Sequence, residues 1–184
     1  MRDVATDFCS ACGAAYSEGA GWPRTCGRCG AVRYRNPLPV AVCLLPVRST
    51  PRTRPGLVLI RRAIEPQRGQ LALPGGFIDF GESWQQAVVR ELREETRIDA
   101  AATDVTLADA LTDEPGGYLL LFGLLPPRDA GDLPPSAPTD ETDGHQVLHE
   151  PQDVGFPLHT LAVRRWFDGA YDRAELQSPR TRTR

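Results

Sequence analysis

Three glutamates, Glu91, Glu94 and Glu95, fall within five residues of one another, and Glu82 lies just upstream. All four belong to the stretch GGFIDFGESWQQAVVRELREETRI, residues 75–98. Like charges this close on a helix repel one another, so a folded chain gathers them at a cost. Carboxylates are hard oxygen ligands that suit Mg²⁺ or Mn²⁺, and Mg²⁺ usually bridges a few of them to substrate phosphates. The stretch predicts a divalent-cation site, with a solvated helix face of Glu–Arg pairs as the alternative.

The element that must position these acids is a helix over residues 83–96, which Ser83 begins as a good N-cap. Residues three and four apart share a helix face, so the three clustered glutamates project to one side. Val88 and Leu92 lie on a neighbouring stripe that can pack onto a sheet. The helix is then fixed by one face and presents its acids on the adjacent one. Two cations held there could polarise a phosphate and lower the pKa of a bound water.

The residues just before the helix fit the same chemistry. Gly75-Gly76 lets the backbone approach a ligand closely and can turn a carbonyl of the Gly76 region toward a metal. Glu82 could complete the metal site or orient a ligand from outside it. These fixed offsets favour a site over a solvated face.

Four of the five cysteines form two pairs, Cys9-x2-Cys12 and Cys26-x2-Cys29, with thirteen residues between the pairs. Each pair can present two thiolates to one tetrahedral zinc ion, and the second pair closes the site. Disulfide or redox chemistry is the alternative, although a cytosolic chain rarely keeps disulfides. The fifth cysteine, Cys43, lies in the apolar run VAVCLLPV and is expected in the core.

Length and composition bound the remaining possibilities. The 184 residues suffice for one ordinary domain with a small appendage, and a hydrophobic fraction of 41% suits a globular protein. The net charge of −3 argues against a large nucleic-acid surface. No apolar run approaches the length of a membrane span, and the N-terminus lacks the apolar core of a signal peptide. We therefore expect a cytoplasmic chain without a membrane partner.

The pattern along the chain predicts a mixture of strands with two helices and hence a layered α/β fold. Pro74-Gly75-Gly76 is predicted to break the pattern and open a loop. A second, amphipathic helix is predicted near the C-terminus over residues 158–170, and the tail SPRTRTR should be disordered. The expected strands are Val40–Val47, Leu57–Arg61, Leu71–Leu73, Val105–Leu111, Tyr118–Leu125 and, with weaker support, His145–His149.

The acidic stretch resembles the box of the Nudix hydrolase family, G-x5-E-x7-R-E-U-x-E-E-x-G-U, in which U is apolar. Only the last glycine of the box departs, because this chain has Arg97 there. The segments RRAIEPQRGQLALPGGF, YRNP after the cysteines, and Phe156-Pro157 resemble the subgroup with an N-terminal zinc ribbon. The matching residues of the box are Gly76, Glu82, Arg90, Glu91, Leu92, Glu94, Glu95 and Ile98.

This resemblance implies a Nudix α/β/α sandwich with a mixed sheet, preceded by a small zinc ribbon. The implied segments are a ribbon over 1–36, a Nudix domain over 37–177 and a disordered tail over 178–184. It also implies a homodimer, since dimers are frequent in this family.

The resemblance further implies Mg²⁺- or Mn²⁺-dependent hydrolysis of the diphosphate linkage of a nucleoside diphosphate joined to another moiety, such as ADP-ribose or a nucleotide sugar. Glu91 and Glu95 would be the primary metal ligands, and Glu94 a third ligand or the holder of the metal-bound water. Arg90 would brace the glutamates, and the Gly76 region would lend a backbone carbonyl. The general base is either a box glutamate or Glu141 on a later loop, whose alternative role is that of an exposed loop acid.

Arg97 stands where a left-handed C-cap is common, a conformation that costs an arginine ~1 kcal/mol. It leaves open a second function, a catalytically weakened Nudix domain that senses a nucleotide. A third, action on RNA ends, lacks the basic stripe that it requires. The downstream motif S-Q-P-W-P-F-P-x-S of NADH-selective relatives is absent.

Aromatic and imidazole side chains carry less information. Phe77, Tyr118 and Phe122 could stack on a base, although their apolar neighbours favour core positions. The three histidines show no metal-ligand spacing with the cysteines; they are His145, His149 and His159.

Overall fold

The structure is a computed structural model that describes residues 7–50, 54–114 and 116–172. Its contacts divide the chain into two compact units, Met1–Pro37 and Leu38–Arg184. This boundary falls one residue after the end of the predicted ribbon. The predicted disordered tail, 178–184, lies outside the described residues.

The first unit is built from two similar turns, each centred on one Cys-x-x-Cys pair. In the first turn the amide of Gly13 donates to the carbonyl of Cys9 at 2.8 Å; in the second, Gly30 donates to Cys26 at 2.9 Å. Both glycines have positive φ, 70° and 74°, which glycine adopts without strain. A hairpin of β1 (Arg24–Thr25) and β2 (Val32–Arg33) spans the second turn. The repeated geometry brings both pairs of sulfurs close to one another.

A second feature of this unit is a stacked arginine. The Arg24 guanidinium lies 4.7 Å from the centre of the Trp22 ring and 5.5 Å from that of Tyr16. Cation–π stacking of this kind contributes about 0.5–1 kcal/mol at exposed sites. One of the arginines near the cysteines therefore serves packing within the unit.

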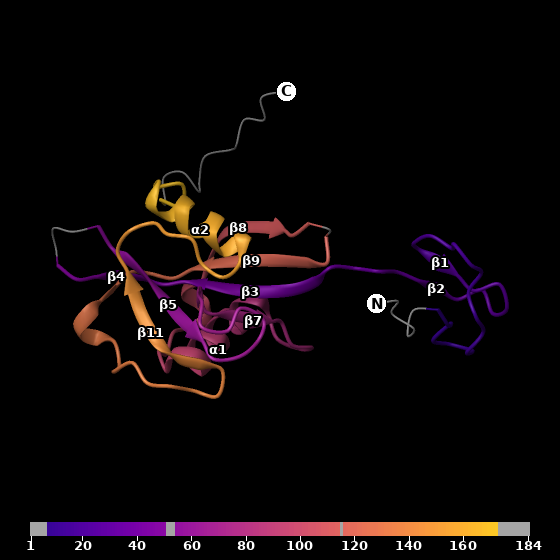
Figure 1. Ribbon diagram of the computed structural model, residues 1–184, viewed down its shortest axis with the longest axis horizontal. Helices are drawn as coiled ribbons and strands as arrows, with labels where there is room; N and C mark the ends of the chain where they lie inside the picture. The colour runs from indigo at the N-terminus through magenta and orange to yellow at the C-terminus, as the bar shows by residue number, and fades with distance from the viewer. Residues whose placement is uncertain (1–6, 51–53, 115, 173–184) are drawn as a thin grey trace, which may run out of the picture. The chain divides into compact units, whose positions relative to one another are not determined.

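The second unit contains two sheets, shown in Figure 1. One has the strand order β7-β3-β9-β8; the other has the order β10-β4-β5-β11, with β6 paired to β5. β3 and β9 are parallel, as are β4 and β10, whereas the other pairs are antiparallel. The strands are β3 (Leu38–Leu44), β4 (Pro46–Arg48), β5 (Gly56–Arg62), β6 (Leu71–Ala72), β7 (Gly75–Phe77), β8 (Thr106–Thr112), β9 (Tyr118–Leu124), β10 (Arg128–Asp129) and β11 (Thr142–Leu148).

Two α-helices cover opposite sides of these strands, α1 (Trp84–Thr96) and α2 (Pro157–Phe167). Successive residues of β5 show the two sides: Leu57 and Leu59 join an apolar cluster with Trp166 of α2, whereas Val58 joins a cluster with Val88 of α1. Side chains alternate across a strand, so a strand buried on both faces reads as a continuous apolar run. The predicted α/β/α sandwich with a mixed sheet is confirmed. Two short 3₁₀ turns, η2 (Ala102–Asp104) and η3 (Ala130–Asp132), complete the elements.

The first predicted strand, Val40–Val47, is in fact two strands in different sheets. The chain leaves β3 after Leu44 and enters β4 at Pro46. Proline has no N–H to donate to a ladder, so an uninterrupted strand is disfavoured there. The apolar run hid this break because its residues are buried in both strands.

The prediction of a loop at Gly75-Gly76 was wrong, because these residues form β7 and pair with β3. A Cβ atom at Gly75 would lie 2.5 Å from the carbonyl oxygen of Ala41, and one at Gly76 would lie 2.3 Å from Oε1 of Glu91. The glycines therefore permit close approach within a sheet and against a helix. They do not interrupt the strand.

Helix α1 has the predicted bounds. Ser83 accepts from the amide of Gln86 at 3.2 Å, and the Gln86 side chain accepts from the amide of Ser83 at 2.7 Å, which completes a capping box. Val88 and Leu92 are fully buried, and each contributes about 1.5–3 kcal/mol of apolar burial. Helix α2 ends at Phe167, three residues before the predicted end.

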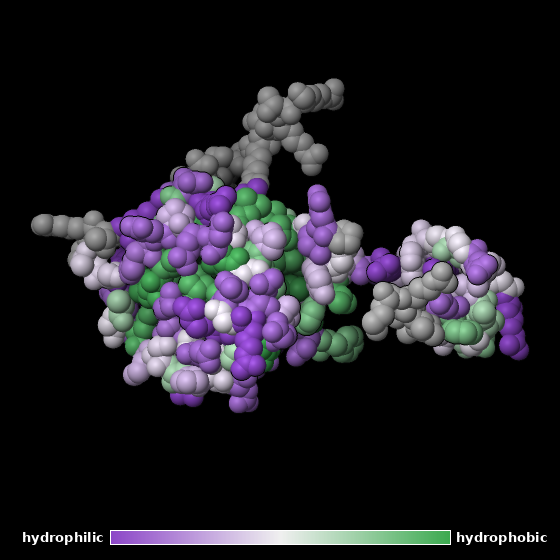
Figure 2. All heavy atoms as spheres, viewed as in Figure 1, coloured by the Kyte–Doolittle hydropathy of each residue, from purple (hydrophilic) through white to green (hydrophobic). Residues whose placement is uncertain are grey.

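Hydrophilic residues occupy much of the face of the second unit drawn in Figure 2, with apolar side chains between them. Within the described ranges, neither helix combines the length and the apolarity needed to cross a bilayer.

Candidate active site

The four paired cysteines bring their sulfurs to one point, as the spacing predicts. All four Sγ atoms lie within 4.8 Å of one another, with Cys9 and Cys29 at 3.7 Å and Cys12 and Cys26 at 3.6 Å. A tetrahedral zinc with bonds of about 2.3 Å separates its sulfurs by about 3.8 Å. None of the described cysteines is in a disulfide. The sulfur geometry fits zinc.

Backbone amides favour the thiolate form of two of these cysteines. The N–H of Ala11 lowers the pKa of Cys9 to about 6, and the N–H of Cys29 lowers the pKa of Cys26. The thiolate is the form that binds a metal. At Cys12 the lowering effect of the Ala14 amide is outweighed by the neighbouring cysteines, which raise its pKa. The turns therefore position all four sulfurs and favour the thiolate at Cys9 and Cys26.

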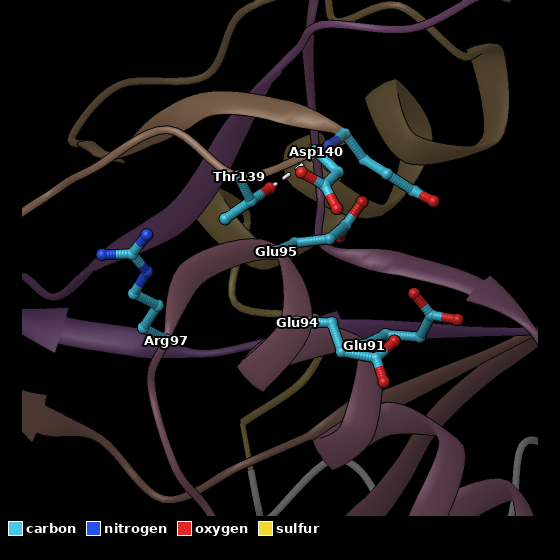
Figure 3. Close-up of a pocket in the computed structure, with 7 residues that line it drawn as sticks. Glu91, Glu94, Glu95, Arg97, Thr139 and Asp140 are labelled. Atoms are coloured by element: carbon cyan, nitrogen blue, oxygen red, sulfur yellow. Dashed lines mark hydrogen bonds between the residues drawn. The ribbon is translucent and has the colours of Figure 1, made fainter.

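The second cluster lies on the C-terminal half of α1. Glu91 and Glu95 are buried, with 9% and 2% of their surface exposed, whereas the side chain of Glu94 is 51% exposed. The three glutamates line a pocket of about 440 Å³ together with Arg97, Thr139, Asp140 and Glu141. Figure 3 shows the glutamates on the helix and Thr139 and Asp140 on the facing segment. Five carboxylates and one guanidinium thus surround a single open space.

Arg90 connects the glutamates to one another. Its guanidinium donates to Glu82 at 2.7 and 3.1 Å, to Glu91 at 2.8 Å and to Glu94 at 3.1 Å. A further N–H donates to the carbonyl of Phe77 at 2.9 Å. These bonds lower the pKa of Glu82 and raise the pKa of Arg90 relative to their ordinary values. Arg90 therefore occupies the predicted bracing position.

Glu82 lies beside Arg90 and is not among the residues that line the pocket. Its carboxylate also accepts from the amide of Asp79 at 2.8 Å. Of the two predicted roles, this position favours orienting a neighbour over completing the metal site.

Glu95 is the most buried of the acids. It accepts from the amide of Gly75 at 2.9 Å, yet burial raises its pKa to about 8. Burial also raises the pKa of Glu91, against the opposing effect of Arg90. Within the described residues Glu95 forms no ion pair. A buried carboxylate without a cationic partner is stabilised by a bound cation, and oxygen donors suit Mg²⁺ or Mn²⁺. The donor set fits the predicted metal.

The structure brings the predicted Glu141 to the same pocket and adds Thr139 and Asp140, which sequence reasoning missed. The proximity of Glu141 raises the pKa of both Glu91 and Glu95. The one local indication was the cluster T-D-E-T, residues 139–142, within a Pro- and Asp-rich loop. Which acids of that loop face the helix depends on long-range packing.

Two of the three aromatic candidates were wrongly expected in the core. Phe77 is 54% and Tyr118 42% exposed, with ring centres 6.1 Å apart, whereas Phe122 is fully buried. Phe77 is the last residue of the edge strand β7. Tyr118 is the first residue of β9 and lies one residue beyond the β8 pairing, which ends at Leu119. Apolar neighbours in sequence gave no indication of these positions at strand ends.

The histidines lie outside both clusters. His159 is buried and accepts from the amide of Leu73 at 3.3 Å, and burial lowers its pKa to about 3. His149 is exposed, and Nδ1 of His145 is buried without a partner in the described part of the chain.

A family model described as the NUDIX domain matches residues 37–168, which include both sheets, both helices and the acidic pocket. The chain belongs to the NUDIX family. The match begins at the end of the first unit, so the cysteine cluster lies outside the NUDIX domain itself.

Two curated relatives share parts of this NUDIX chain. An ADP-ribose pyrophosphatase of Methanocaldococcus jannaschii is 52% identical over 40 residues, 22% of this chain and 24% of the relative. The Nudix hydrolase NudL of Escherichia coli O7:K1 is 37% identical over 106 residues, 55% of this chain and 52% of the relative. The chain thus spans about a quarter and about half of these relatives.

Solved structures share the fold of the NUDIX domain. A NUDIX hydrolase from Nitrosomonas europaea superposes with a TM-score of 0.63 at 24% identity, over 89% of this chain and 91% of that one. The NUDIX domain of Shewanella oneidensis NrtR, complexed with ADP ribose, superposes with a TM-score of 0.56 at 17% identity, over 73% of this chain and 89% of that one. A bifunctional NMN adenylyltransferase/ADP ribose pyrophosphatase of Francisella tularensis, complexed with AMP and a Mn ion, superposes with a TM-score of 0.58 at 18% identity. The superposition covers 73% of this chain and 42% of that one.

Proposed function

We propose that this NUDIX domain hydrolyses the diphosphate linkage of a nucleoside diphosphate joined to another moiety, with ADP-ribose as the first substrate to test. The observation that carries the proposal is the open pocket in which Glu91, Glu94, Glu95 and Glu141 face one another. The printed names of one relative and one solved structure, both ADP-ribose pyrophosphatases, support the choice of substrate.

The chain's own residues would hold a divalent cation between α1 and the loop. Glu91 and Glu95 would be its main ligands, with Glu94 as a third and the Gly76 carbonyl as a backbone ligand. Arg90 hydrogen-bonds Glu91 and Glu94, and the amide of Gly75 hydrogen-bonds Glu95. Because these side chains are already held in place, they would lose little conformational freedom when the cation binds. A bound Mg²⁺ or Mn²⁺ supplies positive charge that polarises the diphosphate and makes the attacking water more acidic.

In the proposed step, the oxygen of a water molecule forms a bond to one phosphorus of the diphosphate. The bond from that phosphorus to the bridging oxygen breaks, and the two halves leave as phosphates. Glu141, on the wall opposite the helix, accepts a proton from the water. Its exposed position leaves it able to reach a water in the pocket and to release the proton to solvent.

For the first unit we propose a structural zinc held by Cys9, Cys12, Cys26 and Cys29. Four cysteine ligands leave no open position for substrate, in contrast to catalytic zinc sites. A unit of this size has little apolar core, so the metal would supply much of its folding free energy. The predicted homodimer is tested by the mass of the purified protein in light scattering.

The decisive experiment incubates the protein with Mg²⁺ and a panel of ADP-ribose, NADH, FAD, dinucleoside polyphosphates and nucleoside triphosphates, and measures the phosphates released. Turnover of at least one diphosphate-linked compound is expected, and its loss on removal of Mg²⁺ would establish the metal requirement.

The same experiment separates the second candidate, a nucleotide-sensing module. Tight binding of ADP-ribose without turnover of any compound would support the sensor and overturn the hydrolase. The structure weakens the main argument for the sensor, because Arg97 adopts the left-handed conformation of the glycine that it replaces, with φ of 63°.

A further inference from the structure

Arg97 ends helix α1 in a conformation that arginine rarely takes. Its φ and ψ are 63° and 18°, and its amide donates to the carbonyl of Arg93 at 2.8 Å. Among the described non-glycine residues, Gln67 is the one other with positive φ. Glycine would adopt this backbone without strain. Arginine at this position therefore carries a backbone cost that glycine would not.

The side chain of Arg97 reaches across to the loop on the far wall of the pocket. Its Nη2 donates to the carbonyl of Pro138 at 3.1 Å, a link between residues 41 positions apart. A second link lies nearby, where the hydroxyl of Thr142 donates to the carbonyl of Glu95 at 2.9 Å. The segment from Pro138 to Thr142 is thus attached at both ends to the last turn of α1.

The segment between these two links is a turn closed on itself. The amide of Thr139 donates to the carbonyl of Thr142 at 2.8 Å, and the two hydroxyls lie 3.1 Å apart. The amide of Glu141 donates to the hydroxyl of Thr139 at 3.3 Å. Asp140 and Glu141 form the tip of this turn, so the two attachments to α1 set how far the tip stands from the glutamates of the helix.

Electrostatic repulsion acts against this arrangement. The carboxylates of the tip face those of Glu91, Glu94 and Glu95 across the pocket, and like charges at short range repel one another. Arg97 is the cation that lines the same pocket. Figure 3 shows it at the end of the helix that lies toward Thr139. Its guanidinium bonds the segment that carries two of these carboxylates.

We propose that Arg97 is a positioning residue for the reaction: its bond to Pro138 holds the turn 139–142 against the end of α1, so that Glu141 faces the glutamates of the helix. This inference rests on the proposed function, because it assigns Arg97 an effect that acts through Glu141. Arg97 contacts the loop, and no contact of Arg97 with the reacting atoms is required.

The test replaces Arg97 with glycine, which keeps the left-handed backbone and removes the guanidinium. The melting temperature should fall by no more than about 2 °C, since relief of the backbone offsets one exposed hydrogen bond. The kcat for ADP-ribose should fall about tenfold with KM changed less than twofold, because a displaced base slows the chemical step and not binding. Amide hydrogen exchange of residues 139–142 should accelerate, while that of α1 should not change.

Three comparisons make the result specific. Arg97→Lys, which keeps the charge and a donor group on a shorter side chain, should lie between wild type and Arg97→Gly in both kcat and exchange. Arg93→Gln, an exposed arginine on the same helix outside the pocket lining, should match wild type. In a Glu141→Gln background, Arg97→Gly should cause no further loss of kcat, because the residue through which it acts is already neutral.

Unchanged exchange in Arg97→Gly would overturn the inference, and so would a full tenfold further loss in the Glu141→Gln background. A rise in KM alone would overturn it too, since that result would place Arg97 on the substrate. If wild type turns over no compound of the panel, the proposed function fails separately. The exchange rates then decide on their own whether Arg97 holds the turn.

Discussion

The cysteine cluster and the acidic pocket are both candidate metal centres, and they are built in opposite ways. The four sulfurs lie within 4.8 Å of one another, and in the described part of the chain they are the one group of acid, thiol or imidazole ligands gathered so closely. The carboxylates stand apart around an open pocket of about 440 Å³. A centre that holds a fold together closes on its ion, whereas one that performs chemistry keeps room for a substrate.

The two centres also differ in what supports them. The cysteines lie on short turns, and neither of the two apolar core clusters includes a described residue of this unit. The glutamates lie on a helix that buries Val88 and Leu92 completely. Removal of zinc should therefore unfold the first unit. Removal of Mg²⁺ or Mn²⁺ should leave the second unit folded but inactive.

The largest expected effect is at the cysteines. Cys12→Ser should abolish zinc binding and unfold the first unit, because a structural zinc contributes about 10–16 kcal/mol of apparent binding free energy. Zinc content per chain and limited proteolysis within residues 7–37 measure this, with Ser10→Ala as the control. ADP-ribose turnover should change less than twofold, and loss of turnover would show that the two centres are not independent.

Next in size is the loss of a carboxylate from the pocket. Glu95→Gln keeps the shape of the side chain and removes the charge, so turnover should fall below detection while the circular dichroism spectrum stays unchanged. Glu150→Gln, at an exposed site away from the pocket, is the matched control and should match wild type. Substantial residual turnover in Glu95→Gln would remove this residue from the proposed metal site.

A smaller loss is expected at the facing wall. Glu141→Gln should lower kcat about 100-fold with little change in KM, as the loss of a general base typically does. The same variant should bind Mg²⁺ as wild type does, which calorimetry can measure. Weakened Mg²⁺ binding would instead make Glu141 a metal ligand.

Taken per pH unit, the smallest effect concerns the stability of the metal-free pocket. The pKa of Glu95 is about 8 in the folded chain and ordinarily 4.5, so folding favours the protonated acid. Its stabilising contribution is complete below pH 4.5 and is lost as the pH rises through 8, by at most about 1.4 kcal/mol per pH unit. Urea unfolding in Mg²⁺-free buffer should show this decline. Glu95→Gln should flatten it, and added Mg²⁺ should reverse it at pH 8.

Local spacing was sufficient to predict both clusters. The Cys-x-x-Cys pairs, the Ser83 cap and the run of glutamates each act within a few residues, and the structure has them as predicted. The α/β/α layers followed from the family resemblance, and the bounds of α1 followed from its cap and periodicity.

Features that depend on distant residues could not be predicted in this way. The pair Gly75-Gly76 predicts a loop from local sequence. Its place in a strand depends on the close approach of Ala41 and Glu91, which are distant in sequence. The position of Glu141 depends on two long-range hydrogen bonds, from Arg97 to the carbonyl of Pro138 and from Thr142 to the carbonyl of Glu95. No local sequence pattern encodes these bonds. The exposure of Phe77 and Tyr118 likewise depends on where the paired strands end.

The shared bonding of Arg90 has a consequence for how a newly made chain matures. One guanidinium already neutralises part of the charge on Glu82, Glu91 and Glu94, and Glu95 can remain a neutral acid until an ion arrives. The larger unit can thus fold without its cation and bind it afterwards. The cysteine unit would instead draw much of its folding free energy from the proposed zinc, so we expect its folding to follow metal binding.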